Sequence, residues 1–126
     1  MNIYLFSAGA LCVILGLFHS ILGELSIFRA KGRSDNLVSA DLKVRHLGII
    51  WATWHLASFL GWCIGAMLIS IALEQDLISI ELLKFIITSI AIAMVSSSIL
   101  VFIGTKAKHP GWIVLLGIGI LTLLGI

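Results

Sequence analysis

Two histidines and one glutamate stand inside segments that are otherwise strongly apolar. The first segment contains HSILGE, residues 19–24, and the second contains WATWHLAS, residues 51–58. His19 and His55 carry imidazoles, which can ligate iron, form hydrogen bonds or relay protons. Glu24 is the only carboxylate in the first segment. Because polar groups in hydrocarbon are costly unless they are satisfied, these three side chains are the leading candidates for a functional site.

The spacing of these residues argues against a compact metal site. Glu24 follows His19 by five residues, or about 7 Å along a helix. His46 and His55 are nine residues apart, or about 13 Å, whereas metal ligands lie about 2 Å from one shared ion. The sequence has no H-E-x-x-H, no C-x-x-C and no glycine-rich phosphate loop. We therefore predict no metal site and no catalytic residues.

The composition indicates that most of the chain lies in a membrane. Of the 126 residues, 60% are hydrophobic and 11% are charged, whereas soluble domains have about 25% charged residues. A domain of this size has too little interior to bury so much apolar surface. The formal net charge of +2 provides no basic face that would neutralise many phosphates. We therefore expect the lipid bilayer, and no nucleic acid, as a partner.

Four apolar segments approach the length of about 20 residues that crosses the hydrocarbon core as a helix. They cover about residues 3–28, 45–72, 82–104 and 110–126, and the last is near the lower limit. The sequence therefore predicts an all-α integral membrane protein. Its single domain, residues 1–126, is expected to fold as a four-transmembrane-helix bundle.

The charged residues between these segments predict the orientation. The first and third connections carry seven basic residues, and the second connection carries none before Lys84. Positively charged loops stay in the cytoplasm. We therefore expect both termini on the side of the membrane opposite the cytoplasm, which is the periplasmic side if the membrane is the bacterial cytoplasmic (inner) membrane that the resemblance described below implies. The seven residues are Arg29, Lys31, Arg33, Lys43, Arg45, Lys106 and Lys108.

Small residues recur along every apolar segment, and in lipid such residues let helix backbones approach closely. The expected packing stripes are Gly9, Cys12, Gly16, His19 and Gly23; Ala57, Gly61 and Gly65; Ser89, Ala93 and Ser97; and Gly119, Thr122 and Gly125. The first two helices are expected to pack antiparallel, in a register where paired residue numbers sum to about 74. That register places His19 opposite His55.

The histidine pair has three open interpretations. In the first, His19 and His55 hold the helices together within a buried polar cluster. In the second, the two imidazoles are the axial ligands of a b-type haem, since histidine ligation is ordinary haem chemistry. In the third, the pair belongs to a path for protons or small solutes. The other residues of the predicted polar cluster are Ser20, Glu24, His46, Trp51, Trp54 and Ser58.

The residues near the predicted cytoplasmic boundary have simpler explanations. Glu24 can form an ion pair there with Arg29, Arg45 or His46, or it can serve as a functional carboxylate beside the histidines. An aromatic belt accounts for the tryptophans on that side. Those tryptophans are Trp51, Trp54 and Trp112, whereas Trp62 is expected to pack in the core and His109 to be a solvated loop residue.

The stretches HSILGE, residues 19–24, and WHLAS, residues 54–58, resemble a group of small bacterial four-span membrane proteins. That group carries H-S-x-L-G-E in the first helix and W-H-x-x-S in the second. The resemblance covers the first half of the chain and implies the architecture and a bacterial inner-membrane location, without a mechanism. From the residues we expect an accessory or interaction protein rather than an enzyme, acting with other membrane-protein subunits or with a second copy. The alternatives are a haem-binding redox carrier and a proton or small-solute conductor.

Overall fold

The computed structural model describes residues 1–29, 44–73 and 79–126, and every regular element in these ranges is helical. The prediction of an all-α fold is therefore confirmed for the described part of the chain. Helix α1 runs over Ile3–Gly23 and continues directly into η1, a π-helical turn over Glu24–Phe28. The other helices are α3 (Val44–Leu73), α4 (Ile80–Gly104) and α5 (Gly111–Leu124).

Three of these helical segments are long and apolar enough to cross a membrane, namely Ile3–Phe28, Gly48–Leu73 and Ile80–Gly104. The chain therefore has the character of a multi-pass membrane protein. Helix α5 has 14 residues and so spans about 21 Å, which is less than the hydrocarbon thickness of about 30 Å. The fourth predicted span is thus matched by an apolar helix that is too short to cross by itself.

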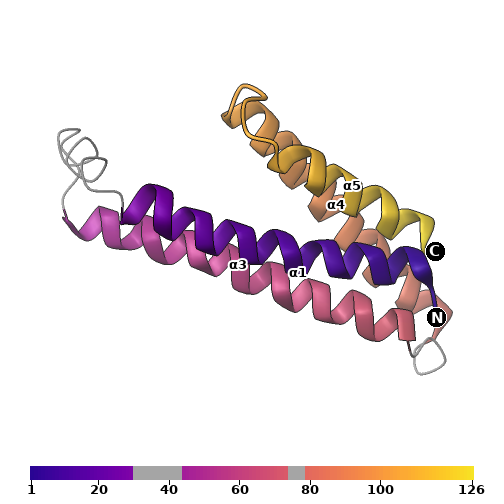
Figure 1. Cartoon of the computed structure of the whole chain (residues 1–126). Helices are drawn as coiled ribbons and strands as arrows, with labels where there is room; N and C mark the ends of the chain where they lie inside the picture. Colours follow the sequence, from indigo (N-terminus) through magenta and orange to yellow (C-terminus); the bar gives the residue numbers. More distant parts are fainter. Residues whose placement is uncertain (30–43, 74–78) are drawn as a thin grey trace.

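The helices form two pairs that meet at one end of the molecule. Helices α1 and α3 lie side by side and antiparallel, and α4 packs against α5 (Figure 1). Helix α5 also packs against α1 near the two chain termini, and the pairs diverge toward their other ends. Asn2 ties this end together, because its N–H donates to the Ala72 carbonyl and its Nδ2 to the Gly125 carbonyl, both at 2.9 Å.

Backbone contact between α1 and α3 fixes their register. A Cβ atom on Gly9 would lie 2.7 Å from the Gly65 carbonyl oxygen, and one on Gly65 would lie 2.9 Å from that of Gly9. Only glycine permits so close an approach. Seven residues further along α1, a Cβ atom on Gly16 would lie 3.3 Å from the carbonyl oxygen of Ser58. Both pairs have numbers that sum to 74, so the predicted antiparallel register is confirmed.

The small-residue stripes are correct for some helices and only partly correct for α4. Gly119 and Thr122 are buried in α5, and Gly125 is buried at its C-cap, as expected. In α4, Ser89 and Ala93 are exposed, whereas Ser97 is half-buried. The residues buried in α4 are Ile87, Ile90, Ala91, Met94 and Ser98. The stripe therefore did not identify the packed face of α4, to which larger apolar residues contribute.

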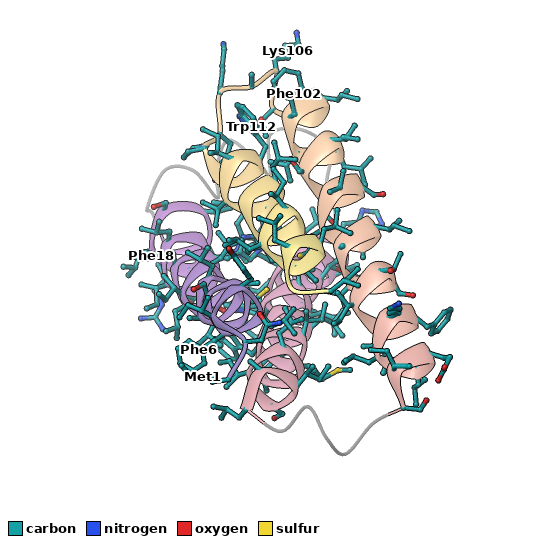
Figure 2. The ribbon with its side chains drawn as sticks, turned by 90° about the vertical axis from the view of Figure 1, so that its right-hand side faces the viewer. Met1, Phe6, Phe18, Phe102, Lys106 and Trp112 are labelled. Atoms are coloured by element: carbon teal, nitrogen blue, oxygen red, sulfur yellow. The ribbon has the colours of Figure 1, made fainter. Side chains whose placement is uncertain are left out.

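Large apolar side chains cover the outside of the bundle, as expected where the surrounding solvent is lipid. Phe18 is 59% exposed and points away from the other helices (Figure 2). Phe102 and Trp112 pack edge to face, with ring centroids 5.1 Å apart, beside the turn that carries Lys106. The interior near the termini is formed by buried residues of all four helices, including Leu5, Leu68, Ile87 and Ile118.

Candidate functional site

Glu24 is the centre of a polar cluster where α1 passes into η1. Its Oε1 accepts a hydrogen bond from Arg29 Nε at 2.8 Å, which is also an ion pair. Its Oε2 accepts from Trp51 Nε1 at 2.9 Å and lies 3.4 Å from His55 Nε2. The predicted ion pair with Arg29 is therefore present, and the carboxylate joins α1 to α3. His46 is exposed on α3, and the side chain of Arg45 lies outside the described residues.

His55 is held between Glu24 and Ser20 by both of its ring nitrogens. Its Nδ1 lies 2.9 Å from Ser20 Oγ. Since the carboxylate can only accept, Nε2 carries the proton toward Glu24, and Nδ1 accepts the hydroxyl proton of Ser20. Trp51 packs edge-on against the imidazole, with the ring centroids 4.7 Å apart. His55 is therefore a satisfied linking residue between α3 and α1.

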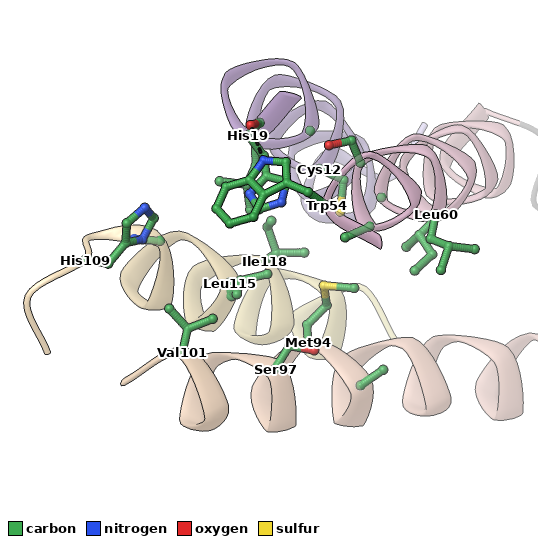
Figure 3. Close-up of a pocket in the computed structure, with 18 of the residues that line it drawn as sticks. Cys12, His19, Trp54, Leu60, Met94, Ser97, Val101, His109, Leu115 and Ile118 are labelled. Carbon is green, nitrogen blue, oxygen red and sulfur yellow. Dashed lines mark hydrogen bonds between the residues drawn. The ribbon is translucent and has the colours of Figure 1, made fainter. Parts of the chain in front are cut away.

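His19 has different surroundings, although it lies on the same pair of helices. Its imidazole stacks on the Trp54 indole with ring centroids 4.2 Å apart and planes only 5° from parallel (Figure 3). Trp54 Nε1 donates to the His19 backbone carbonyl at 2.9 Å. Gly23 makes room for the indole, because a Cβ atom there would overlap Trp54. Trp54 is therefore part of the helix interface, which corrects its assignment to an aromatic belt.

The two imidazoles do not fit the predicted haem site. A shared iron would need a free ring nitrogen from both His19 and His55. Both nitrogens of His55 are within hydrogen-bonding distance of other side chains. His19 lines a cavity of which His55 is not part. In the part of the chain that the structure describes, no three His, Cys, Asp or Glu side chains are grouped to hold a metal ion.

A cavity of about 560 Å³ lies between the α1/α3 pair and the α4/α5 pair. The His19–Trp54 stack forms one wall, and side chains of α4 and α5, among them Met94 and Ile118, face it from the other side (Figure 3). Its lining is mostly apolar. The polar side chains among the lining residues are His19, Ser58, Ser97, Thr105 and His109, and the thiol of Cys12 also contributes.

His109 is a residue of this cavity that sequence reasoning missed. It was predicted to be a solvated loop residue, and it is indeed exposed, but it also lines the cavity. Its Nδ1 accepts a hydrogen bond from the Gly111 N–H at 3.1 Å. The turn before it contains Lys106 and Ala107, both with positive φ. The only available signal was the position of His109 just before Pro110, which begins the return of the chain into α5.

Ser58 also differs from its predicted place. It was expected to join the cluster around His55, but it lies one turn further along α3 and lines the cavity. The residue is 2% exposed, and its Oγ has no hydrogen-bond partner among the described residues. Trp62 packs in the helix interface as predicted, where its Nε1 donates to the Val13 carbonyl at 3.2 Å.

Comparison of the chain with protein-family models, with curated proteins and with solved structures finds no match. The site is therefore interpreted from its own geometry.

Proposed function

We propose that this small multi-pass membrane protein binds a lipid-soluble small molecule in the cavity between its two helix pairs. The observation that supports the proposal is the cavity itself. Its volume of about 560 Å³ falls within the range of about 300–1,000 Å³ that is typical of ligand pockets. A few polar side chains in a mostly apolar lining are also typical of such pockets.

The arrangement of the helices explains why this space is left open. The pairs pack closely near Asn2 and Gly125 and diverge beyond them. Where the two pairs diverge, the side chains that face the cavity lack packing partners on that side. A guest molecule of suitable shape restores those contacts, which favours binding in the cavity over an empty state.

The polar cluster around Glu24 supports the binding proposal, because it holds η1 against α3 close to the cavity. Glu24 and His55 connect η1 to α3, one turn from the His19–Trp54 stack that forms a cavity wall. The contacts described for the cluster join α1 and η1 to α3. This short network favours a structural role over the path for protons or solutes that the sequence also allowed.

The place of the protein in the cell extends the proposal. With both termini periplasmic and the membrane a bacterial inner membrane, the turn with Lys106 and the wide end of the molecule would face the cytoplasm. A binding protein of this kind fits the accessory role expected from the sequence. Stoichiometric co-purification of another membrane protein would test that role, and its absence in gentle detergent would count against it.

Native mass spectrometry of the protein in gentle detergent tests the binding proposal. We expect wild-type protein to carry a small lipid-soluble molecule at one per chain. Ala93→Phe should abolish that adduct, because Ala93 lines the cavity and the larger ring fills it. Ala66→Phe is the matched control, since Ala66 is exposed on α3 and does not line the cavity. Equal adducts on both variants, or bare wild-type protein, would contradict the proposal.

A further inference from the structure

The lining of the cavity changes from apolar to polar along its length. Helix α1 contributes residues from Cys12 to His19, and α4 contributes residues from Ala93 to Thr105. The helix pairs meet near the chain termini, so Cys12 and Ala93 lie toward that junction, and His19 and Thr105 lie where the pairs diverge (Figure 1). His109 lines the diverging end as well. Three polar side chains are therefore gathered at one end of the cavity.

The remainder of the lining is mostly apolar and is long enough for a hydrocarbon chain. From Ala93 to Thr105, α4 follows the cavity for about 18 Å, the length of about 14 carbons in an extended chain. The Ser58 hydroxyl is fully buried and so adds no polar surface there. The aliphatic side chains in this part are Leu15, Ile64, Met94, Leu115 and Ile118. The shape and lining suit an amphiphile with one alkyl chain.

Two imidazoles meet at the polar end, one from each helix pair. His19 and His109 both line the cavity (Figure 3), and they are close enough for charges on the two rings to interact. His109 Nδ1 accepts a hydrogen bond from the Gly111 N–H, so the neutral ring carries its proton on Nε2. The His19 ring stacks on Trp54 through its face, whereas its N–H group lies at the ring edge. The polar end therefore supplies hydrogen-bond donors.

The turn that carries His109 adds positive charge at this end. Lys106 and Lys108 are exposed in the turn, and Lys106 extends outward from it (Figure 2). The turn directly follows the apolar segment Ile80–Gly104, which places it at the boundary between lipid and water. His109 is exposed as well, so a charged group beside it stays at the edge of the cavity, where burial of charge is not required.

The acidic residues of the described part of the chain do not offset this charge. They are Glu24 and Glu81. Glu24 is already paired with Arg29 at 2.8 Å, and Glu81 lies in the first turn of α4, at the opposite end of that helix from the lysines. An anionic group at the polar end would therefore meet a positive potential and two imidazole donors.

We propose that the cavity binds a single-chain anionic amphiphile, with its carboxylate or phosphate beside His19 and His109 and its alkyl chain along the apolar lining. The inference rests on the proposed function and adds the class and orientation of the ligand. The imidazole N–H groups donate to the anionic oxygens. Lys106 and Lys108 attract the head group over a range of about 10 Å, the screening length of salt solutions.

Three probes of equal chain length separate the head group from the apolar contacts. Tetradecanoate and tetradecyl phosphate are anionic, and methyl tetradecanoate is neutral. Each competes against photolabelling of Ile64 and Met94 by a phenyldiazirine, on the full chain in phosphatidylcholine nanodiscs. Every probe is compared between wild type and variants in the same lipid, so that its partitioning into the bilayer cancels.

His109→Phe retains a ring without the N–H donor, and it should weaken competition by the anionic probes roughly two- to tenfold, the effect of one hydrogen bond. The double variant Lys106→Gln/Lys108→Gln should weaken it roughly two- to fivefold and leave methyl tetradecanoate unchanged. The larger effect among the two anions identifies the head group as carboxylate or phosphate. His46→Phe and Lys84→Gln are the matched controls, because both residues are exposed and neither lines the cavity.

The contradicting results fall into two classes. If the probes compete but neither His109→Phe nor the lysine variant affects the anions more than the ester, the anionic class is wrong and the cavity still binds alkyl chains. The same holds if Lys84→Gln acts as strongly as the lysine variant. If no probe competes and labelling does not saturate, the proposed function fails together with the inference.

Discussion

At the scale of single residues, close fits between glycine and tryptophan determine where His19 lies. The Trp54 indole occupies the space over Gly23 and stacks on the His19 ring. The same indole bonds to the backbone carbonyl of His19. The cavity wall formed by His19 and Trp54 therefore depends on the absence of a side-chain methyl group at Gly23, four residues after His19.

Gly23→Ala is expected to destabilise the protein by about 1–3 kcal/mol, the usual cost of overpacking a tight interface. The added methyl would overlap Trp54, which cannot move without losing its bond to His19. The midpoint of unfolding in mixed micelles measures the effect. Gly117→Ala is the control, because a Cβ atom there meets nothing within 4 Å. Equal stability of both variants would show that Gly23 and Trp54 are not in contact.

The bond between Glu24 and Trp51 is expected to appear as an energetic coupling. Glu24→Ala and Trp51→Phe each remove one side of a 2.9 Å hydrogen bond, so their effects on stability should not add. A double-mutant cycle by micelle unfolding measures the coupling. Glu24→Ala combined with Trp62→Phe is the control, since Trp62 bonds to Val13 and should give additive effects. Additivity in both cycles would remove Glu24 from the interface.

Sequence reasoning found part of this residue-scale picture. The polar character of Glu24, His55 and Ser20 in an apolar segment was enough to predict that they would meet. It did not show that the His19 and His55 rings have different surroundings. The His19 ring stacks on Trp54, whereas the His55 ring lies between Ser20 and Glu24. No sequence pattern distinguishes these two environments. His109 could not be placed at all, since its position follows from the direction in which α5 returns.

At the scale of elements, α1 and α3 are joined by two similar contacts. In each, an indole of α3 covers a glycine of α1 and donates to a nearby α1 carbonyl. Trp54 covers Gly23, and Trp62 covers Gly16. Backbone carbonyls in lipid gain from such added donors, and the two contacts hold the register that Gly9 and Gly65 define.

Trp54→Phe and Trp62→Phe should each cost about 0.5–2 kcal/mol, because each removes one interhelical hydrogen bond and retains an aromatic ring. The two sites are eight residues apart, or about 12 Å along α3. Their effects on the free energy of unfolding should therefore add. Trp112→Phe is the control, since the hydrogen bond across helices at Trp112 uses its backbone carbonyl, and its ring contact with Phe102 needs only an aromatic ring. A Trp54→Phe or Trp62→Phe variant as stable as this control would contradict the account.

The register of α1 against α3 was predictable because the spacing of small and polar residues along the two helices leaves few alternatives. The packed face of α4 was not. Large apolar residues occur on every side of α4, so hydrophobicity does not distinguish its lipid face from its protein face. In such a helix the small residues are a weak guide, and Ile87 and Ile90 were chosen by the shapes of their neighbours instead.

At the scale of the whole molecule, the two helix pairs are joined near the chain termini and diverge toward their other ends. Asn2 and Gly125 link them at that end, and the cavity lies between them. No sequence pattern predicted this cavity, because its volume depends on the angle between the pairs. Its walls come from α1, α3, α4 and α5, so binding should require the intact fold.

Photolabelling in native membranes is the most direct test of this cavity. A small phenyldiazirine is photolysed with membranes that contain the protein, and the labelled peptides are mapped by mass spectrometry. We predict saturable labelling at residues of α3 and α4 that line the cavity, namely Gly61, Ile64, Met94, Ser97 and Val101. Exposed Phe18 and Phe59 should show only labelling that rises linearly with probe concentration. Linear labelling of all these positions alike would contradict a binding cavity between the two helix pairs.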